Sequence, residues 1–170
     1  MYFVANDGVH GPEIWRTDGI TGGEQRLTDI NPTQNAVARP PTHLTLAGEW
    51  LYFTADDQEH GDELWRLHQV SGEPELVRDV YFGRASSNPE ELTLAGGLLF
   101  FRAEAPGKGV ELWATDGTAA GTHIVKDLFN GPESSGPAQL HAFASILLFS
   151  ARSVMHVRKE AQRILWWTDG

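Results

Sequence analysis

The chain has 170 residues, a formal net charge of −10, 41% hydrophobic and 21% charged residues, which is the composition of a globular protein. The acidic balance works against binding to nucleic acid or to an anionic membrane surface, because both need clustered basic side chains. The chain has no cysteine, which excludes disulfides and thiolate chemistry, and no apolar run approaches the roughly 18 residues of a membrane-spanning helix.

The sequence repeats with a period of about 48 residues. Four phenylalanines mark the start of the repeats with spacings of 50, 48 and 48 residues: Phe3, Phe53, Phe101 and Phe149. A tryptophan follows in each repeat: Trp15, Trp65, Trp113 and Trp166. An aspartate stands 14 residues after each of the first three tryptophans: Asp29, Asp79 and Asp127. This regularity indicates a repeat architecture, with the fourth tryptophan displaced by five residues.

Each repeat contains four predicted strands, which are clearest in the second repeat. Residues 51–55 are rich in aromatic and β-branched side chains, the next strand centres on 63–65, the third covers 75–79 and the fourth 92–94. No segment keeps an apolar period of 3.6 residues for ten residues, so we expect little helix.

Four antiparallel strands in about 48 residues are typical of a β-propeller blade. We therefore expect an all-β, propeller-like array that forms a partial or open ring within one domain. Its predicted segments are blades 1–50, 51–98 and 99–146 and a half repeat of two strands at 147–170. A β-sandwich, which would make the period accidental, and a solenoid of stacked hairpins are the alternatives.

Residues 111–127, Glu-Leu-Trp-Ala-Thr-Asp-Gly-Thr followed by Ala-Ala-Gly-Thr-His-Ile-Val-Lys-Asp, resemble the bacterial ELWxxDGT repeat, also called hyalin-like. With the first strand and turn at 2–15, the resemblance covers essentially the whole chain. It implies a tandem array on a secreted or cell-surface bacterial protein, without catalytic residues. The chain departs from the pattern at 67–69, where Leu-His-Gln replaces Thr-Asp-Gly, and at 153–162, where the turn is five residues longer.

The ends of the sequence raise a separate expectation. The chain opens in a first strand without a signal peptide and stops after a second strand at 167–170. We expect either a fragment of a longer array or self-association that completes the last blade.

The repeated polar and aromatic residues favour structural roles. Three glutamates precede the strand tryptophans: Glu13, Glu63 and Glu111. Catalysis needs carboxyl groups in different environments, so equivalent copies are expected to bind backbone amides or a neighbouring blade. The repeated tryptophans are expected in the core between blades, and the repeated aspartates at the ends of third strands are expected to bind loop amides. Trp50 and Trp167 stand outside the repeat positions, and are the candidates for stacking against a protein or carbohydrate ligand.

Acidic turns raise the possibility of calcium, which prefers oxygen ligands. The candidate ligands are Asp7, Asp18, Asp57 and Asp116. No complete calcium-loop motif is present, and Asp-Gly is independently a favoured hairpin turn, so turn chemistry is the competing interpretation. His10 and His60 are expected to be surface turn residues.

The sequence thus favours a non-catalytic scaffold or binding module without a required cofactor. A calcium-stabilised adhesion module is one alternative. A fragment of a quinoprotein-like propeller enzyme is the other, because such propellers also repeat a glycine turn followed by a strand tryptophan, as in residues 61–65.

Overall fold

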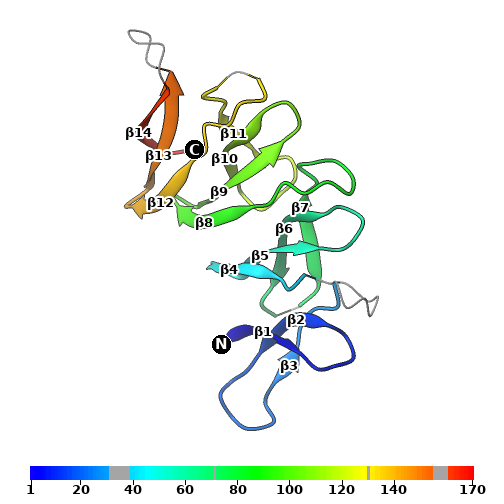
Figure 1. The fold of residues 1–170 in the computed structure, drawn as a ribbon. Helices are drawn as coiled ribbons and strands as arrows, with labels where there is room; N and C mark the ends of the chain where they lie inside the picture. Colours follow the sequence, from blue (N-terminus) through cyan, green and yellow to red (C-terminus); the bar gives the residue numbers. More distant parts are fainter. Residues whose placement is uncertain (31–38, 71, 130, 155–160) are drawn as a thin grey trace. The chain divides into compact units, whose positions relative to one another are not determined.

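The computed structural model describes residues 1–30, 39–70, 72–129, 131–154 and 161–170. These residues form 14 β-strands and no helix, which confirms the predicted all-β class (Figure 1). None of them belongs to a helix that could cross a membrane. The strands form four antiparallel sheets, two in each of two compact units, Met1–Ser86 and Ser87–Gly170.

The first unit contains sheets A and B. Sheet A has the strand order β1 (Tyr2–Asn6), β2 (Pro12–Arg16) and β3 (Gln25–Arg26). Sheet B has the order β4 (Thr42–Ala47), β5 (Trp50–Asp56), β6 (Asp62–His68) and β7 (Pro74–Arg78). Each strand pairs with its neighbours in the chain, so both sheets are simple meanders.

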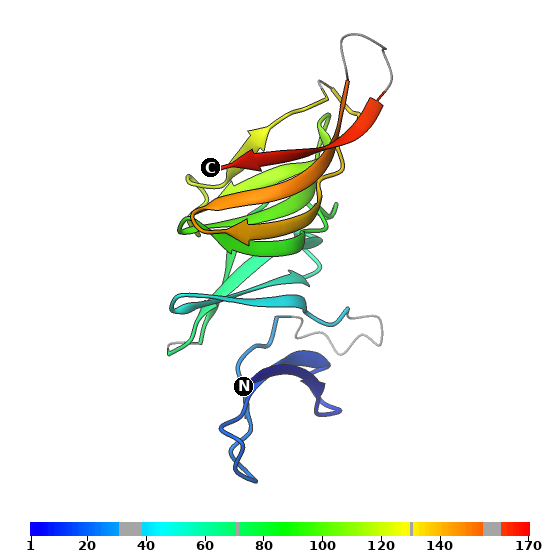
Figure 2. The ribbon, with the colours of Figure 1, turned by 90° about the vertical axis from the view of Figure 1, so that its left-hand side faces the viewer.

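The second unit contains sheets C and D. Sheet C has the order β8 (Glu90–Ala95), β9 (Leu98–Ala105), β10 (Gly109–Thr115) and β11 (His123–Lys126). Sheet D has the order β12 (Ala138–Phe143), β13 (Ile146–Val154) and β14 (Ala161–Thr168). Figure 2 shows β12, β13 and β14 as one layer beside sheet C. Residues 155–160 of the unusual turn in the fourth repeat lie outside the described residues.

The sheets are offset from the sequence repeats. Repeat 51–98, for example, contributes β5, β6 and β7 to sheet B but β8 to sheet C. The cause is a two-residue hairpin between the last strand of one repeat and the first strand of the next. The first turn residue has a positive φ in all three hairpins: Gly48 (60°), Gly96 (58°) and Ala144 (54°). Such turns match the twist of paired strands, so the fourth strand joins the following sheet.

The first strand of sheets B, C and D carries a bulge, and the bulges follow one another at a constant spacing along the chain. The pairing register shifts in each strand, and a residue other than glycine adopts a left-handed conformation there: His43 (φ 55°), Glu91 (54°) and Gln139 (59°). These positions are 48 residues apart, so the irregularity is part of the repeat.

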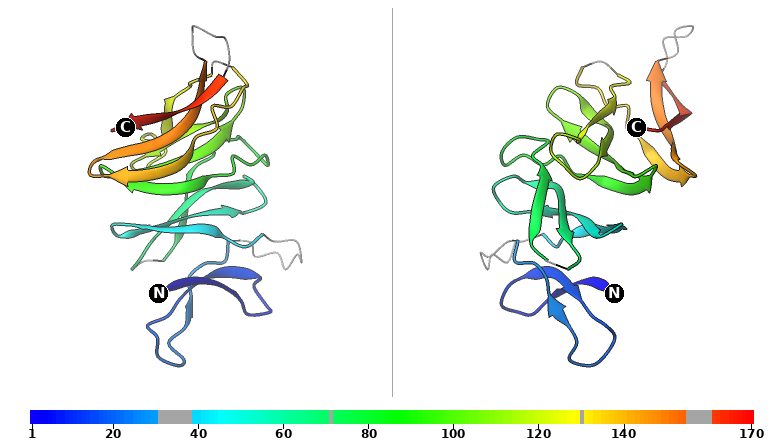
Figure 3. Two further views of the ribbon diagram at one scale, coloured as in Figure 1. Left: turned by 60° about the vertical axis from the view of Figure 1, so that its left-hand side comes forward. Right: turned by 180° about the vertical axis from the view of Figure 1, so that it is seen from behind.

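The two units contain the same packing interface. We call the side of each sheet that carries the repeated phenylalanine its Phe face, and the opposite side its reverse face. In the first unit, Ile14 on the reverse face of sheet A shares a buried cluster with Leu51, Phe53 and Ala55 on the Phe face of sheet B. The two layers are visible in Figure 3.

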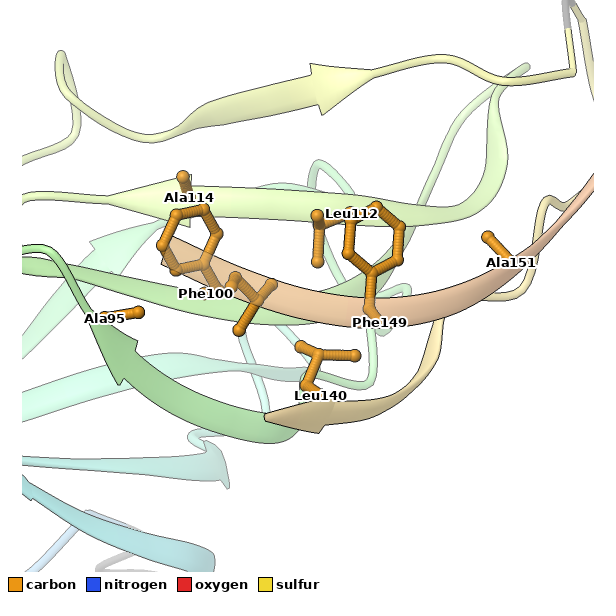
Figure 4. Close-up of a cluster of buried hydrophobic side chains, with 8 residues drawn as sticks. Ala95, Phe100, Leu112, Ala114, Leu140, Phe149 and Ala151 are labelled. Atoms are coloured by element: carbon orange, nitrogen blue, oxygen red, sulfur yellow. The ribbon is translucent and has the colours of Figure 1, made fainter. Parts of the chain in front are cut away.

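In the second unit, Phe100, Leu112 and Ala114 on the reverse face of sheet C pack against Leu147, Phe149 and Ala151 of sheet D (Figure 4). The Phe-face residues are the counterparts of Leu51, Phe53 and Ala55, each 96 positions later in the chain. A single rule therefore describes both interfaces, in which a reverse face packs on the Phe face of the next sheet.

Candidate interaction surface

The glutamates that precede the repeated strand tryptophans are fully buried: Glu13, Glu63 and Glu111. Each accepts a hydrogen bond from a backbone N–H of the loop that follows the third strand of its repeat. Glu13 Oε2 accepts from Ile30 N–H at 3.3 Å and from the hydroxyl of Thr28 at 2.5 Å. Glu63 Oε1 accepts from Tyr81 N–H at 3.0 Å. The expected binding of backbone amides is present in all three copies.

Glu111 accepts hydrogen bonds at both of its carboxylate oxygens. Its two carboxylate oxygens accept from the N–H and the hydroxyl of Ser135 at 2.7 and 2.5 Å, and Leu128 N–H lies at 3.5 Å. Burial raises the pKa of Glu111, while the hydrogen bonds from Ser135 and Leu128 oppose this and the nearby charge of Asp127 adds to it. Glu111 fixes the loop between β11 and β12, since removing it would leave buried donors without an acceptor.

The repeated aspartates differ in their contacts. Asp29 forms an ion pair with Arg26 at 3.0 Å, and Asp127 forms one with Lys108 at 2.9 Å. Asp79 accepts a backbone N–H from the loop after β7 at 3.1 Å. Asp79 therefore shows the expected loop-amide contact in a hydrogen bond, and Asp29 and Asp127 contact cations.

The acidic turns between first and second strands are closed by their own aspartates. Asp7 Oδ1 accepts the N–H groups of Val9 and His10 at 2.8 Å each, and its Oδ2 lies 2.6 Å from His10 Nδ1. Asp57 and His60 repeat this arrangement, with Oδ2 and Nδ1 2.7 Å apart. The two histidines thus lie in equivalent turns and bind an aspartate of the same turn.

These contacts change the acidity of both aspartates. Hydrogen bonds from the backbone and then the side chain of His10 hold the pKa of Asp7 well below its ordinary value. For Asp57, burial raises the pKa, but hydrogen bonds from His60 and Glu59 outweigh burial and lower it. The hydrogen bond with Asp57 raises the pKa of His60, although partial burial opposes the rise.

Asp18 and Asp116 cap the next turn in their repeats. Asp18 Oδ1 accepts Ile20 N–H at 2.9 Å, and Asp116 Oδ1 accepts Thr118 N–H at 2.8 Å. Within the described ranges, the one group of three side chains that could hold a metal ion is Asp57, Glu59 and His60. Of the four candidate calcium ligands, this group contains Asp57.

The repeated tryptophans occupy equivalent strand positions with unequal burial. Trp65 and Trp113 are buried, whereas Trp15 and Trp166 are partly exposed. Trp15 and Trp65 donate their indole N–H to the carbonyl oxygens of Ala5 and Ala55, each at 3.1 Å. Trp65 and Trp166 pack with the hydrophobic clusters of their units, in agreement with the expected core position.

Trp50, one of the two candidate binding residues, has a side-chain partner on its ring. The guanidinium carbon of Arg66 lies 3.9 Å from the ring centroid, and His68 meets the ring edge-on at 5.1 Å. Arg66 is in turn held by Glu75 at 2.9 Å. One face of this indole is therefore covered by a cation–π contact, which reduces its value as a platform for a ligand.

Trp167, the other candidate, lies on an exposed apolar surface. It is 66% exposed on β14, where Leu165 is 73% exposed, and Phe143 on β12 is 66% exposed. The strand register places Trp167 opposite Leu148, and Leu148 opposite His141, so these side chains share the reverse face of sheet D. Exposed apolar residues gathered on one sheet face are typical of an interaction surface.

Sequence reasoning identified Trp167 but missed Leu165 and Phe143. Both occupy ordinary strand positions, and their exposure follows from which face of sheet D packs on sheet C. The sequence did contain a signal for Leu165. It directly precedes Trp166, as Leu112 precedes Trp113, and this position places both leucines on the same face of their sheets.

The first unit also has a cavity of about 550 Å³, whose lining includes Tyr2, Arg16, Gln25 and Gln69. Arg16 donates to the carbonyl of Gln69 at 3.0 Å and to the side chain of Gln25 at 2.7 Å. Tyr2 donates to the side chain of Gln69 at 3.2 Å. These polar groups satisfy one another, so the reverse face of sheet D is the stronger candidate for binding.

We compared the chain with models of protein families and with curated proteins, and neither comparison finds a match.

Proposed function

We propose that this chain is a non-catalytic, propeller-like repeat module that acts as a scaffold and binds a partner through the reverse face of sheet D. The observation that carries the proposal is the interface between sheets, which occurs twice with equivalent residues. A sheet that packs on an equivalent sheet through the same pair of faces can build extended or closed arrays.

The repeated carboxylates support a structural role. Glu13, Glu63 and Glu111 are buried in equivalent positions and accept hydrogen bonds from loop amides. Acid–base catalysis instead uses carboxyl groups in contrasting environments, one protonated and one ionised. The resemblance to the ELWxxDGT repeat supports the same role on a secreted or cell-surface bacterial protein.

Each complete sheet, moreover, is a four-stranded antiparallel meander, as in a propeller blade. The meander and the repeated face-to-face interface favour a propeller-like array over a solenoid of hairpins.

The binding role can be tested with the immobilised chain and three classes of analyte: extracellular proteins, bacterial surface polysaccharides and the chain itself. We expect at least one class to bind, and Leu165→Glu to abolish that binding. Phe82→Glu is the matched control, because Phe82 is 87% exposed and lies outside all strands. Binding that persists in Leu165→Glu, or no binding in any class, would contradict the proposed function.

A calcium-stabilised adhesion module is a second candidate, favoured by the Asp57, Glu59 and His60 group. A ligand that binds only the native state raises its melting temperature. Comparing the melting temperature in excess calcium and in chelator therefore tests this candidate. An Asp57→Asn variant supplies the control, since it should remove any calcium-dependent rise.

A further inference from the structure

The interface between sheets has equivalent residues on both of its sides in the two units. On the reverse faces, Tyr2 and Ile14 of sheet A correspond to Phe100 and Leu112 of sheet C, each 98 positions later. The loop residue Ile30 corresponds in the same way to Leu128; Ile30 is a buried member of its cluster, and Leu128 packs against the cluster of the second unit. In both units, the reverse face of one sheet therefore packs on the Phe face of the next sheet through equivalent residues.

Sheet D presents the same reverse face to solvent. Leu165 directly precedes Trp166, as Ile14 precedes Trp15 and Leu112 precedes Trp113. Ile14 and Leu112 are 0% and 2% exposed, whereas Leu165 is 73% exposed. Sheet D therefore carries one half of the repeated interface, and Leu165 and Trp167 on this half are exposed.

Sheet A presents the complementary half. Its Phe face carries Phe3, Ala5 and Trp15, all of which are partly exposed. The corresponding residues Phe53 and Ala55 in sheet B are 0% and 2% exposed, because sheet A packs on them. Sheet A therefore carries the Phe-face residues that pack against a reverse face in the other sheets, and these residues are only partly covered.

Charge on the two faces is also compatible with contact. The reverse face of sheet D carries the exposed Arg152 and Arg163, and its described residues include no carboxylate. On the Phe face of sheet A, Arg26 pairs with Trp15 and forms an ion pair with the exposed Asp29. The ion pair with Asp29 offsets the charge of Arg26, so the two arginines of sheet D would meet a cation whose charge is already balanced.

We infer that the reverse face of sheet D binds the Phe face of sheet A in a second copy of this chain, head to tail. The inference rests on the proposed function, because it names the partner of the same surface. Such a contact is heterologous, so it leads to a closed ring if the rotation closes and to an open filament otherwise.

The test uses two variants, each blocked on one face. Leu165→Glu places a charge on the reverse face of sheet D, where the native side chain is exposed. Ala5→Arg places a long charged side chain on the Phe face of sheet A, and leaves the carbonyl that accepts the Trp15 indole N–H. Circular dichroism melting of both variants and of the Phe82→Glu control establishes that they fold.

Light scattering over a hundredfold range of concentration gives the expected results. The wild type and Phe82→Glu should reach at least twice the 18.8 kDa mass of one chain. Each blocked variant alone should stay at 18.8 kDa, but an equimolar mixture should give a dimer, because the mixture still holds one intact face of each kind.

Three results would overturn the inference: a monomeric wild type at every concentration, association that survives Leu165→Glu, or a mixture of blocked variants that stays monomeric. Association that survives Leu165→Glu would point to another surface, such as the edge of β14. The proposed function has a separate outcome, since a monomeric wild type can still bind a protein or polysaccharide through the same face.

Discussion

Leu112 in β10 and Leu165 in β14 each precede a repeated tryptophan and occupy the same place in their sheets, yet Leu112 is 2% exposed and Leu165 is 73% exposed. The difference arises because sheet D covers Leu112, while Leu165 has no such cover in the described part of the second unit. Equivalent sequence positions therefore serve as core in one sheet and as surface in the next.

Replacing Glu111 should destabilise the second unit. Glu111→Ala leaves the N–H groups of Ser135 and Leu128 without their buried acceptor, so we expect a loss of about 2–4 kcal/mol in the free energy of unfolding. Ser135→Ala should cost less, about 1–2 kcal/mol, because the backbone N–H keeps its partner. Urea unfolding measures both, with the exposed Glu133→Ala as a control expected within about 0.5 kcal/mol of wild type.

Glu111 should also give a defined pH dependence. Its pKa is raised in the folded state above the ordinary value of about 4.5, so the folded state holds this proton more tightly than the unfolded chain. The contribution of Glu111 to stability should fall as the pH rises from about 4.5 through the raised pKa. The free energy of unfolding of wild type minus that of Glu111→Gln isolates this contribution, and a difference that is constant or rises with pH would contradict it.

The turn between β5 and β6 should titrate through His60 and Asp57. The pKa of His60 is raised by Asp57, so its stabilising contribution is present below about pH 6.5 and is lost as the pH rises through the folded pKa. The pKa of Asp57 is lowered, so its contribution is present above about pH 3.8 and is lost as the pH falls through the folded pKa. In an NMR titration, Asp57→Asn should lower the pKa of His60. Glu59→Gln, the matched control, should change that pKa much less.

The hairpin turns predict opposite effects of two reciprocal substitutions. Ala144 has a φ of 54° where the other repeats have Gly48 and Gly96. Because a left-handed conformation costs a residue with a Cβ about 1 kcal/mol, Ala144→Gly should raise the free energy of unfolding by up to that amount. Gly48→Ala should lower it by a similar amount, since a Cβ there meets no atom within 4 Å and only the conformation is penalised. Thermal unfolding of the two variants checks the pair, and changes of the same sign would contradict it.

Periodicity in the sequence was sufficient to locate the strands. Residues 51–55 were expected as a strand and β5 covers Trp50–Asp56, because a short segment rich in aromatic and β-branched residues favours a strand. The structural role of Glu111 followed from its repetition. The sequence was not sufficient for the bulge at His43, where a residue other than glycine adopts a positive φ, because tertiary pairing imposes that conformation. Nor did it predict the cover of Trp50 by Arg66, which depends on contact across two paired strands.

The offset between repeats and sheets has a consequence for how such chains change in length. Because repeat 51–98 supplies strands to both sheet B and sheet C, a repeat that is lost removes strands from two sheets. If the excised segment is a whole number of periods of about 48 residues, the strands that remain can pair into complete sheets, whatever the starting point of the excision. An excision that removes only some of the four strands of a period would instead leave a sheet with the wrong number of strands.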